Sequence, residues 1–171
     1  MTVGRGVPAA PQSEEGEVAS EDDSESGENV EPQTEEEKRE AAEEKAVNNF
    51  DDLTDKWTDE GGGKNPTLKD VDAFVAQFRK IPEDRKDECI HRALNLIPDE
   101  NVMLLAGVLM DRTQSDEIVD AVFSDILNRD EDVKLPVMKQ VLKDPKHPCW
   151  EDAAWIVDVT QDAETADESK K

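Results

Sequence analysis

The sequence predicts an all-α protein: three antiparallel helix pairs in a stack, or an irregular six-helix bundle, preceded by an amphipathic capping helix and a disordered acidic arm. Three observations support this prediction. Helix-start signals recur at nearly equal intervals through the later part of the chain. Between them, apolar residues repeat with the three-to-four-residue period of a helix. The N-terminal part is acidic and polar and has no such period.

The two ends of the chain are predicted to be disordered. Residues 1–45 contain 15 Asp and Glu against 4 Lys and Arg, with Ser and Gly clusters such as SEDDSESGE. Ordering such a segment costs roughly 1 to 2 kcal/mol per residue in entropy, and there is little apolar surface to bury in return. We therefore expect disorder in residues 1–33 and again in residues 162–171.

A first amphipathic helix is predicted over residues 34–60. Thr34 and Glu37 have the spacing of a capping box at its start. Apolar residues then follow at steps of four, three and four: Ala46, Phe50, Leu53 and Trp57. A lone short helix is marginal in water, so we expect Phe50, Leu53 and Trp57 to dock as a cap, near Val71 and Val75. The glycines of a flexible linker, residues 61–65, allow the chain to reverse.

The segment 66–161 is predicted to be a helical repeat domain. Its helix-start signals are Pro and capping residues at positions 66, 82, 98, 115, 132 and 148. The intervals between them are 16, 16, 17, 17 and 16 residues. Two such helices form a unit of 32 to 34 residues. Three units are about the minimum for a stable helical array.

One helix of this series is apolar on every side. Every residue from Val102 to Met110 is apolar or glycine, in a chain with a formal net charge of -24. We expect it to be enclosed by its neighbours in the stack, the helices at 83–97, 116–128 and 133–143.

Two of the turns are similar to each other. IPDENV and NRDEDV are each followed by an apolar helix that ends in Leu-x-Asp, at Leu109 to Asp111 and at Leu142 to Asp144. Over about residues 66–160 the chain resembles HEAT-like and other alpha-solenoid repeats. This resemblance implies a right-handed array of antiparallel helix pairs with a binding or scaffolding role.

The charge of the chain limits its partners. Residues 46–161 contain 25 acidic and 14 basic residues. Nucleic acid and anionic membrane surfaces attract clustered Lys and Arg, so neither is expected as a partner. No apolar stretch approaches the roughly 18 residues of a membrane span. We expect a cytoplasmic protein whose partner is another protein.

Candidate chemical groups are few. Cys89, His91, His147 and Cys149 are of the residue types that bind zinc or form a Cys-His nucleophile pair. Residues two apart on a helix point about 200° from each other, so we interpret each pair as a core cysteine and a surface histidine. Neither a metal nor a cofactor is expected.

Two loop motifs are also incomplete. GGGKN at 61–65 lacks the first glycine of a phosphate loop, where Thr58 stands. The series that start at Asp111 and Asn128 lack the glycine and the bidentate glutamate of a calcium loop. We interpret the first as a linker and the others as helix caps.

The last predicted helix carries more apolar residues than one buried face needs. The candidate partner contacts on it are Trp150, Trp155, Ile156 and Val159. Terminal repeats usually present a polar outer side. Either the 34–60 helix folds back over this surface, or a partner covers it.

The leading hypothesis is a non-enzymatic protein-protein interaction or scaffolding module. A secreted effector or secretion-regulator protein is one alternative, because the N-terminus is polar and Ser-rich ahead of a helical domain. An enzyme of unrecognised type is the other.

Overall fold

The structure is a computed structural model that describes residues 34–168, with side chains up to residue 160. The disordered arm expected at residues 1–33 lies outside the described residues. The described part is all-helical, as predicted, and forms one compact unit. Its elements are α1 (Glu35–Lys56), α2 (Leu68–Phe78), α3 (Glu83–Leu96), the short 3-10 helix η1 (Asp99–Asn101), α4 (Met103–Leu109), α5 (Asp116–Leu127), α6 (Glu131–Val141) and α7 (Trp150–Glu168).

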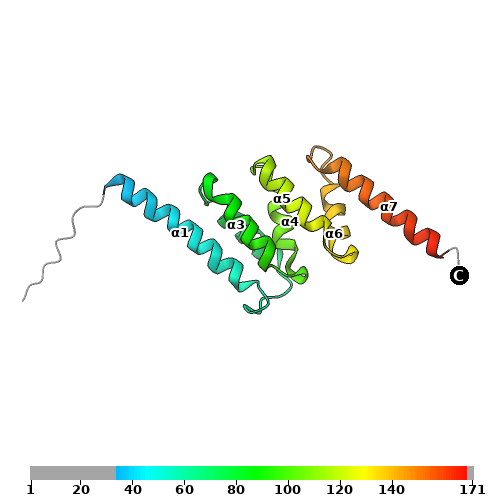
Figure 1. Cartoon of the computed structure of the whole chain (residues 1–171), viewed down its shortest axis with the longest axis horizontal. Coiled ribbons are helices and arrows are strands. Elements are labelled where there is room, and N and C mark those ends of the chain that lie inside the picture. The colour runs from blue at the N-terminus through cyan, green and yellow to red at the C-terminus, as the bar shows by residue number, and fades with distance from the viewer. Residues whose placement is uncertain (1–33, 169–171) are drawn as a thin grey trace, which may run out of the picture. The chain divides into compact units, whose positions relative to one another are not determined.

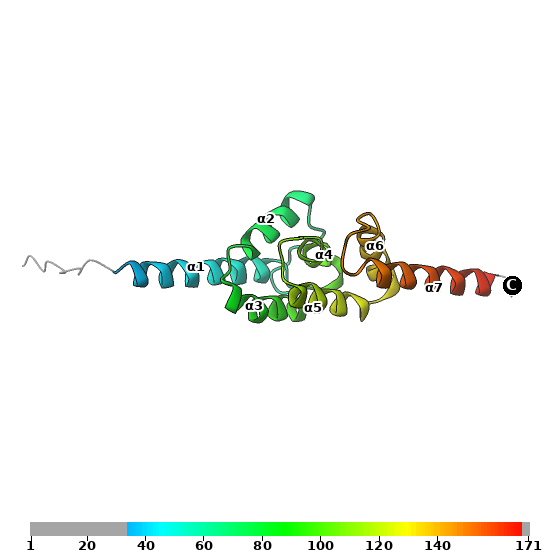
Figure 2. The same cartoon turned by 90° about the horizontal axis from the view of Figure 1, so that it is seen from above.

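The helices alternate between two layers. In Figure 1, α1, α3 and α5 lie side by side and form the first layer. In Figure 2, α2, α4 and α6 lie above α3 and α5 and form the second layer. Ion pairs join corresponding ends within the first layer: Arg92, near the end of α3, binds Asp51 and Asp55 near the end of α1. In the second layer Arg79, at the end of α2, binds Asp111, which follows α4. Helices of one layer therefore run in the same direction.

The capping residues predicted from sequence begin their helices. Thr34 accepts the backbone N–H of Glu37 at 3.2 Å, and Glu37 accepts that of Thr34 at 2.8 Å. Thr67 and Asp70 form the same reciprocal pair at the start of α2. These contacts satisfy backbone donors that the first helical turn leaves without partners.

The first helix packs on α2 and α3 through one buried face. The Phe50 ring is fully buried, with its centroid 4.9 Å from that of Phe74 and 5.3 Å from that of Phe78. Trp57 is also buried, and Leu53 is partly buried against the core. The buried stripe of α1 is offset from the predicted one and consists of Val47, Phe50, Thr54 and Trp57.

The docking surface differs from the expected one. Phe74 and Phe78 of α2 receive the cap, whereas Val71 and Val75 lie against Gly107 of α4. Helical spacing predicts which residues share a face, and it does not say which neighbour that face meets.

The glycine segment after α1 is held in place by a buried asparagine, although the sequence suggested a flexible linker. The Asn101 amide nitrogen donates to the carbonyl oxygens of Trp57 at 2.8 Å and Gly63 at 2.7 Å. Its amide oxygen accepts the N–H of Asn65 at 3.0 Å. Because Asn101 is fully buried, losing these three bonds would leave polar groups without partners.

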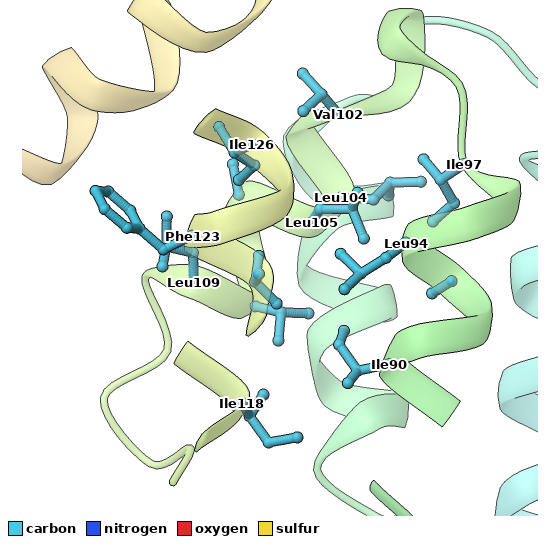
Figure 3. Close-up of a cluster of buried hydrophobic side chains, with 14 of the residues drawn as sticks. Ile90, Leu94, Ile97, Val102, Leu104, Leu105, Leu109, Ile118, Phe123 and Ile126 are labelled. Carbon is cyan, nitrogen blue, oxygen red and sulfur yellow. The ribbon is translucent and has the colours of Figure 1, made fainter. Parts of the chain in front are cut away.

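The apolar helix α4 belongs to the second layer and packs on both α2 and α5. Leu104 and Leu105 are completely buried, and Figure 3 shows them beside Leu94 of α3. As expected, α5 packs on α4. α2 packs along α4 as well, and this neighbour was not expected from the sequence. The reason is Gly107: a β-carbon there would lie 3.0 Å from Val75 Cγ2 and even closer to Val71, so only glycine permits this approach.

The last helix is longer than predicted. α7 continues to Glu168, through most of the 162–171 segment for which disorder was expected. Those residues contain no glycine or proline, so no residue interrupts the helix. Among the described helices, none combines the length and the apolar character that a membrane crossing requires.

A matched pair of leucine substitutions tests the position of α4. Leu105→Ala is expected to lower the free energy of unfolding by about 2 to 5 kcal/mol, because it opens a cavity in a closed core. Leu68→Ala, at a residue that is 82% exposed, should change it by less than about 0.5 kcal/mol. Urea titration of both variants measures the difference. Equal losses would place α4 outside the core.

Candidate protein-interaction surfaces

The face of α4 that points away from the core is open. A groove of about 480 Å³, here called the second-layer groove, runs over this face and continues onto α2 and α6. The residues that line it are Leu68, Val71, Asp72, Val75, Arg79, Met103, Gly107, Met110, Asp111 and Gln140. Three of them, Met103, Gly107 and Met110, form one stripe of α4 and are only partly buried. The helix that the sequence predicted to be enclosed on all sides is therefore open along one.

The groove is mainly apolar, and two of the side chains that line it are flexible methionines. Leu68, at the start of α2, is 82% exposed at its rim. Met103 and Met110 lie one turn before and one turn after Gly107, and the Gln140 amide lies 3.8 Å from the Met103 sulfur. Methionine side chains adapt their shape to an apolar guest. The sequence signal for this groove is the all-apolar run itself, which has more apolar sides than its neighbours cover.

The four candidate contacts on α7 divide into two pairs. Trp155 is 67% exposed and Val159 is 47% exposed, one helical turn apart. Trp150 and Ile156 are partly buried instead, and the Trp150 indole N–H donates to the Leu142 carbonyl at 3.3 Å. The exposed apolar surface of α7 therefore consists of Trp155 and Val159.

The first helix does not cover that surface. α1 packs on α2 and α3, and the Gln77 amide on α2 donates to the Ala46 carbonyl of α1 at 3.1 Å. α7 packs mainly on α6. Helix 34–60 therefore does not fold back over the exposed apolar surface of α7, which was one of the two possibilities suggested by the sequence.

The two Cys-His pairs are not alike. On α3, Cys89 is buried and His91 is exposed, as predicted. Near the start of α7, Cys149 is buried, but the prediction of a surface histidine is wrong for His147, which is buried too. His147 Nδ1 accepts the Cys149 backbone N–H at 3.1 Å, and Nε2 lies 3.0 Å from the Leu109 carbonyl oxygen. Because a carbonyl only accepts, Nε2 carries the proton, and both nitrogens have partners within the protein.

The cysteine environments do not favour a nucleophile. Burial, reinforced by the negative charges of Asp120 and Asp152, raises the pKa of the Cys149 thiol to about 11. Burial also raises the pKa of the Cys89 thiol, and the negative charges of Asp51 and Glu88 raise it further. A thiol needs its thiolate form to attack or to bind a metal, so both groups are unreactive near neutral pH. Within residues 34–160, no cluster of three or more His, Cys, Asp or Glu side chains is arranged to hold a metal.

The glycine loop does not present a phosphate cradle. The three glycine N–H groups donate inside the loop: Gly61 to the Thr58 hydroxyl, Gly62 to the Thr58 carbonyl and Gly63 to the Lys56 carbonyl. A phosphate loop needs free N–H groups that converge on the ligand.

Asp111 binds protein donors rather than a cation. Its carboxylate receives Nε and Nη2 of Arg79, both at 2.7 Å, and the Gln114 amide at 2.6 Å. The hydroxyl and backbone N–H of Thr113 donate to it as well, at 2.9 and 3.2 Å. The side chain is 2% exposed. The calcium-like spacing after Asp111 thus belongs to a structural ion pair.

The same ion pair recurs along the second layer. Arg112 donates to Asp144 at 3.3 Å and to the Lys146 carbonyl at 2.7 Å. Donor and acceptor both lie 33 residues beyond Arg79 and Asp111. The backbone N–H two residues after each aspartate donates to it. This offset equals the unit length suggested by the helix starts, and the two aspartates are those of the Leu-x-Asp motifs.

The hydrogen bonds to Asp111 govern its titration. Burial alone would raise the pKa of this carboxyl, but donation from Arg79, Gln114 and Thr113 outweighs burial and holds the pKa well below its usual range. A depressed pKa means that the folded state favours the ionised carboxylate. This contribution to stability is complete above the unfolded-state pKa of 3.8 and is lost as the pH falls through that value toward the folded-state pKa.

Replacement of Asp111 tests this description. Asp111→Asn should lower the free energy of unfolding by about 1 to 3 kcal/mol at pH 7, because it weakens buried bonds to a charged group. Its more exposed counterpart is the matched control: Asp144→Asn should cost less than about 1 kcal/mol. Denaturant titrations between pH 7 and pH 2 should show the wild type losing its advantage over Asp111→Asn below about pH 5. An advantage that is constant with pH would contradict the ion pair.

Comparison of this chain with protein-family models, curated proteins and solved structures finds no match. The resemblance to HEAT-like repeats therefore remains a prediction. What the chain does has to be inferred from its surfaces.

Proposed function

We propose that this chain is a non-enzymatic protein-interaction module, and that the second-layer groove holds an apolar segment of its partner. One observation carries the proposal. Within a strongly acidic chain, an all-apolar helix leaves Met103, Gly107 and Met110 facing a groove with the exposed Leu68 at its rim. Apolar surface that a fold leaves open in this way is typical of interaction sites.

The shape of the groove suits an amphipathic helix. Its lining residues come from α2, α4 and α6, so an elongated partner would contact three helices. Helices bind such grooves through apolar side chains spaced one turn apart. The two methionines can adjust to different side chains, and Leu68 adds contact area at the edge.

The candidate catalytic groups already have partners within the protein, which supports binding rather than catalysis. The two nitrogens of His147, the carboxylate of Asp111 and the glycine amides of the 61–63 segment are all engaged within the protein. Cys89 and Cys149 are free and buried, which fits a reducing compartment such as the cytoplasm.

A pair of exposed leucines provides the test. The full chain is immobilised, and proteins retained from an extract of its cells of origin are quantified. Leu68→Gln should reduce retention of the groove partner about tenfold, the effect of losing roughly 1.4 kcal/mol of binding energy. Leu96→Gln removes the same side chain from an exposed position that does not line the groove, and should keep retention within about twofold of the wild type.

Folding is checked separately, by confirming that both variants melt as the wild type does. Retention of the same proteins by wild type, Leu68→Gln and Leu96→Gln would show that the groove is not a binding site.

A further inference from the structure

The outer side of α7 carries an apolar pair opposite its buried side. Successive residues of a helix are rotated by about 100°, which places Trp155 and Val159 away from Ala153, Val157 and Thr160. The observed burial agrees: the last three are buried, whereas Trp155 and Val159 are exposed. Trp155 and Val159 are therefore not an incompletely buried edge of the core. They form a separate apolar patch on the solvent side.

The charged residues of α7 next to this patch are all acidic. On the helical rotation Glu151, Asp152 and Asp158 flank Trp155, and all three are exposed. None of the ion pairs described for residues 34–160 includes them. The whole of α7 contains seven Asp and Glu and no Lys or Arg. On α7, the exposed Trp155 is thus flanked by three carboxylates that take part in none of these ion pairs.

This charge decides among the possible occupants. A second copy of the chain that docked through the same face would bring identical carboxylates toward these, and like charges brought together cost several kcal/mol. The first helix of the chain is docked elsewhere. A partner that places Lys or Arg against the three carboxylates gains both ion pairs and the attraction of a cation to the Trp155 ring.

We propose that the Trp155 face of α7 binds a Lys- and Arg-rich amphipathic helix of another protein. Trp155 and Val159 contact its apolar side, while Glu151, Asp152 and Asp158 pair with its cations. This surface differs from the second-layer groove in place and in chemistry, because the groove is apolar and its one arginine is already paired with Asp111. The proposal for this surface does not depend on the proposal for the second-layer groove.

The test uses defined peptides and the full chain. The probe is a synthetic 18-residue helical peptide with leucines on one face and lysines on the other. A second peptide has glutamate in place of every lysine. Calorimetric titration gives Kd for each. We expect the lysine peptide to bind, and the glutamate peptide to bind at least 30-fold more weakly. Between 50 and 200 mM salt the lysine peptide should weaken about tenfold, because salt screens the contributing charges.

Three variants locate the site. Trp155→Ser should weaken binding of the lysine peptide about tenfold, as for an aromatic residue at the centre of an interface. The triple variant Glu151→Lys, Asp152→Lys, Asp158→Lys should weaken it at least 30-fold. A matched triple on α1, Glu36→Lys, Glu40→Lys, Glu44→Lys, changes the net charge equally at exposed positions and should stay within about threefold of the wild type.

Other results would overturn the proposal. Equal weakening by both triple variants would mean that net charge alone attracts the peptide. If Trp155→Ser bound the lysine peptide as the wild type does, Trp155 would not be part of the contact. If the glutamate peptide bound as tightly as the lysine peptide, the surface would have no preference for cations. Leu68→Gln should bind the lysine peptide as the wild type does. Loss of binding in that variant would assign the peptide to the second-layer groove instead.

Discussion

The close approach of α2 and α4 at Gly107 is the contact on which the second layer depends. Val71 and Val75 occupy the space that a β-carbon at residue 107 would need. Because the two helices lie this near each other, Nε and Nη2 of Arg79, at the end of α2, both reach the Asp111 carboxylate at 2.7 Å. The same approach shapes the second-layer groove. A larger residue at 107 would push α2 outward and disturb the ion pair and the groove together.

Local signals predicted the elements well, whereas the pairing of their faces could not be predicted. Thr34 and Thr67 begin helices where the capping spacing placed them, because a cap involves only residues three positions apart. Leu68 shows the limit: it continues the apolar period of α2, yet it lies at the rim of the groove. Periodicity identifies a stripe, and only the packing of distant segments decides whether something covers it. Asn101 was missed for the same reason, since its partners lie 36 to 44 residues away.

Of the four apolar residues that the sequence marked on α7, two are exposed and two are partly buried. An excess of apolar residues marked the helix, but four residues could not be divided into two that face inward and two that face solvent without knowing where α6 lies. The second-layer groove left a signal, the apolar run, that was interpreted as complete burial. His147 was misplaced because a histidine beside a helix start gives no sequence indication of a carbonyl 38 residues away.

Parallel alignment within a layer has an electrostatic consequence. The C-terminal ends of α1, α3 and α5 lie along one edge, and their partial negative charges add to those of Asp59, Asp99 and Glu100, which line hollows there. Arg92 and Arg129 offset only part of this charge. Dissolved cations screen such repulsion, over a Debye length of about 10 Å at 0.1 M salt. We therefore expect the melting temperature of the protein to rise with ionic strength and to be lowest in dilute buffer.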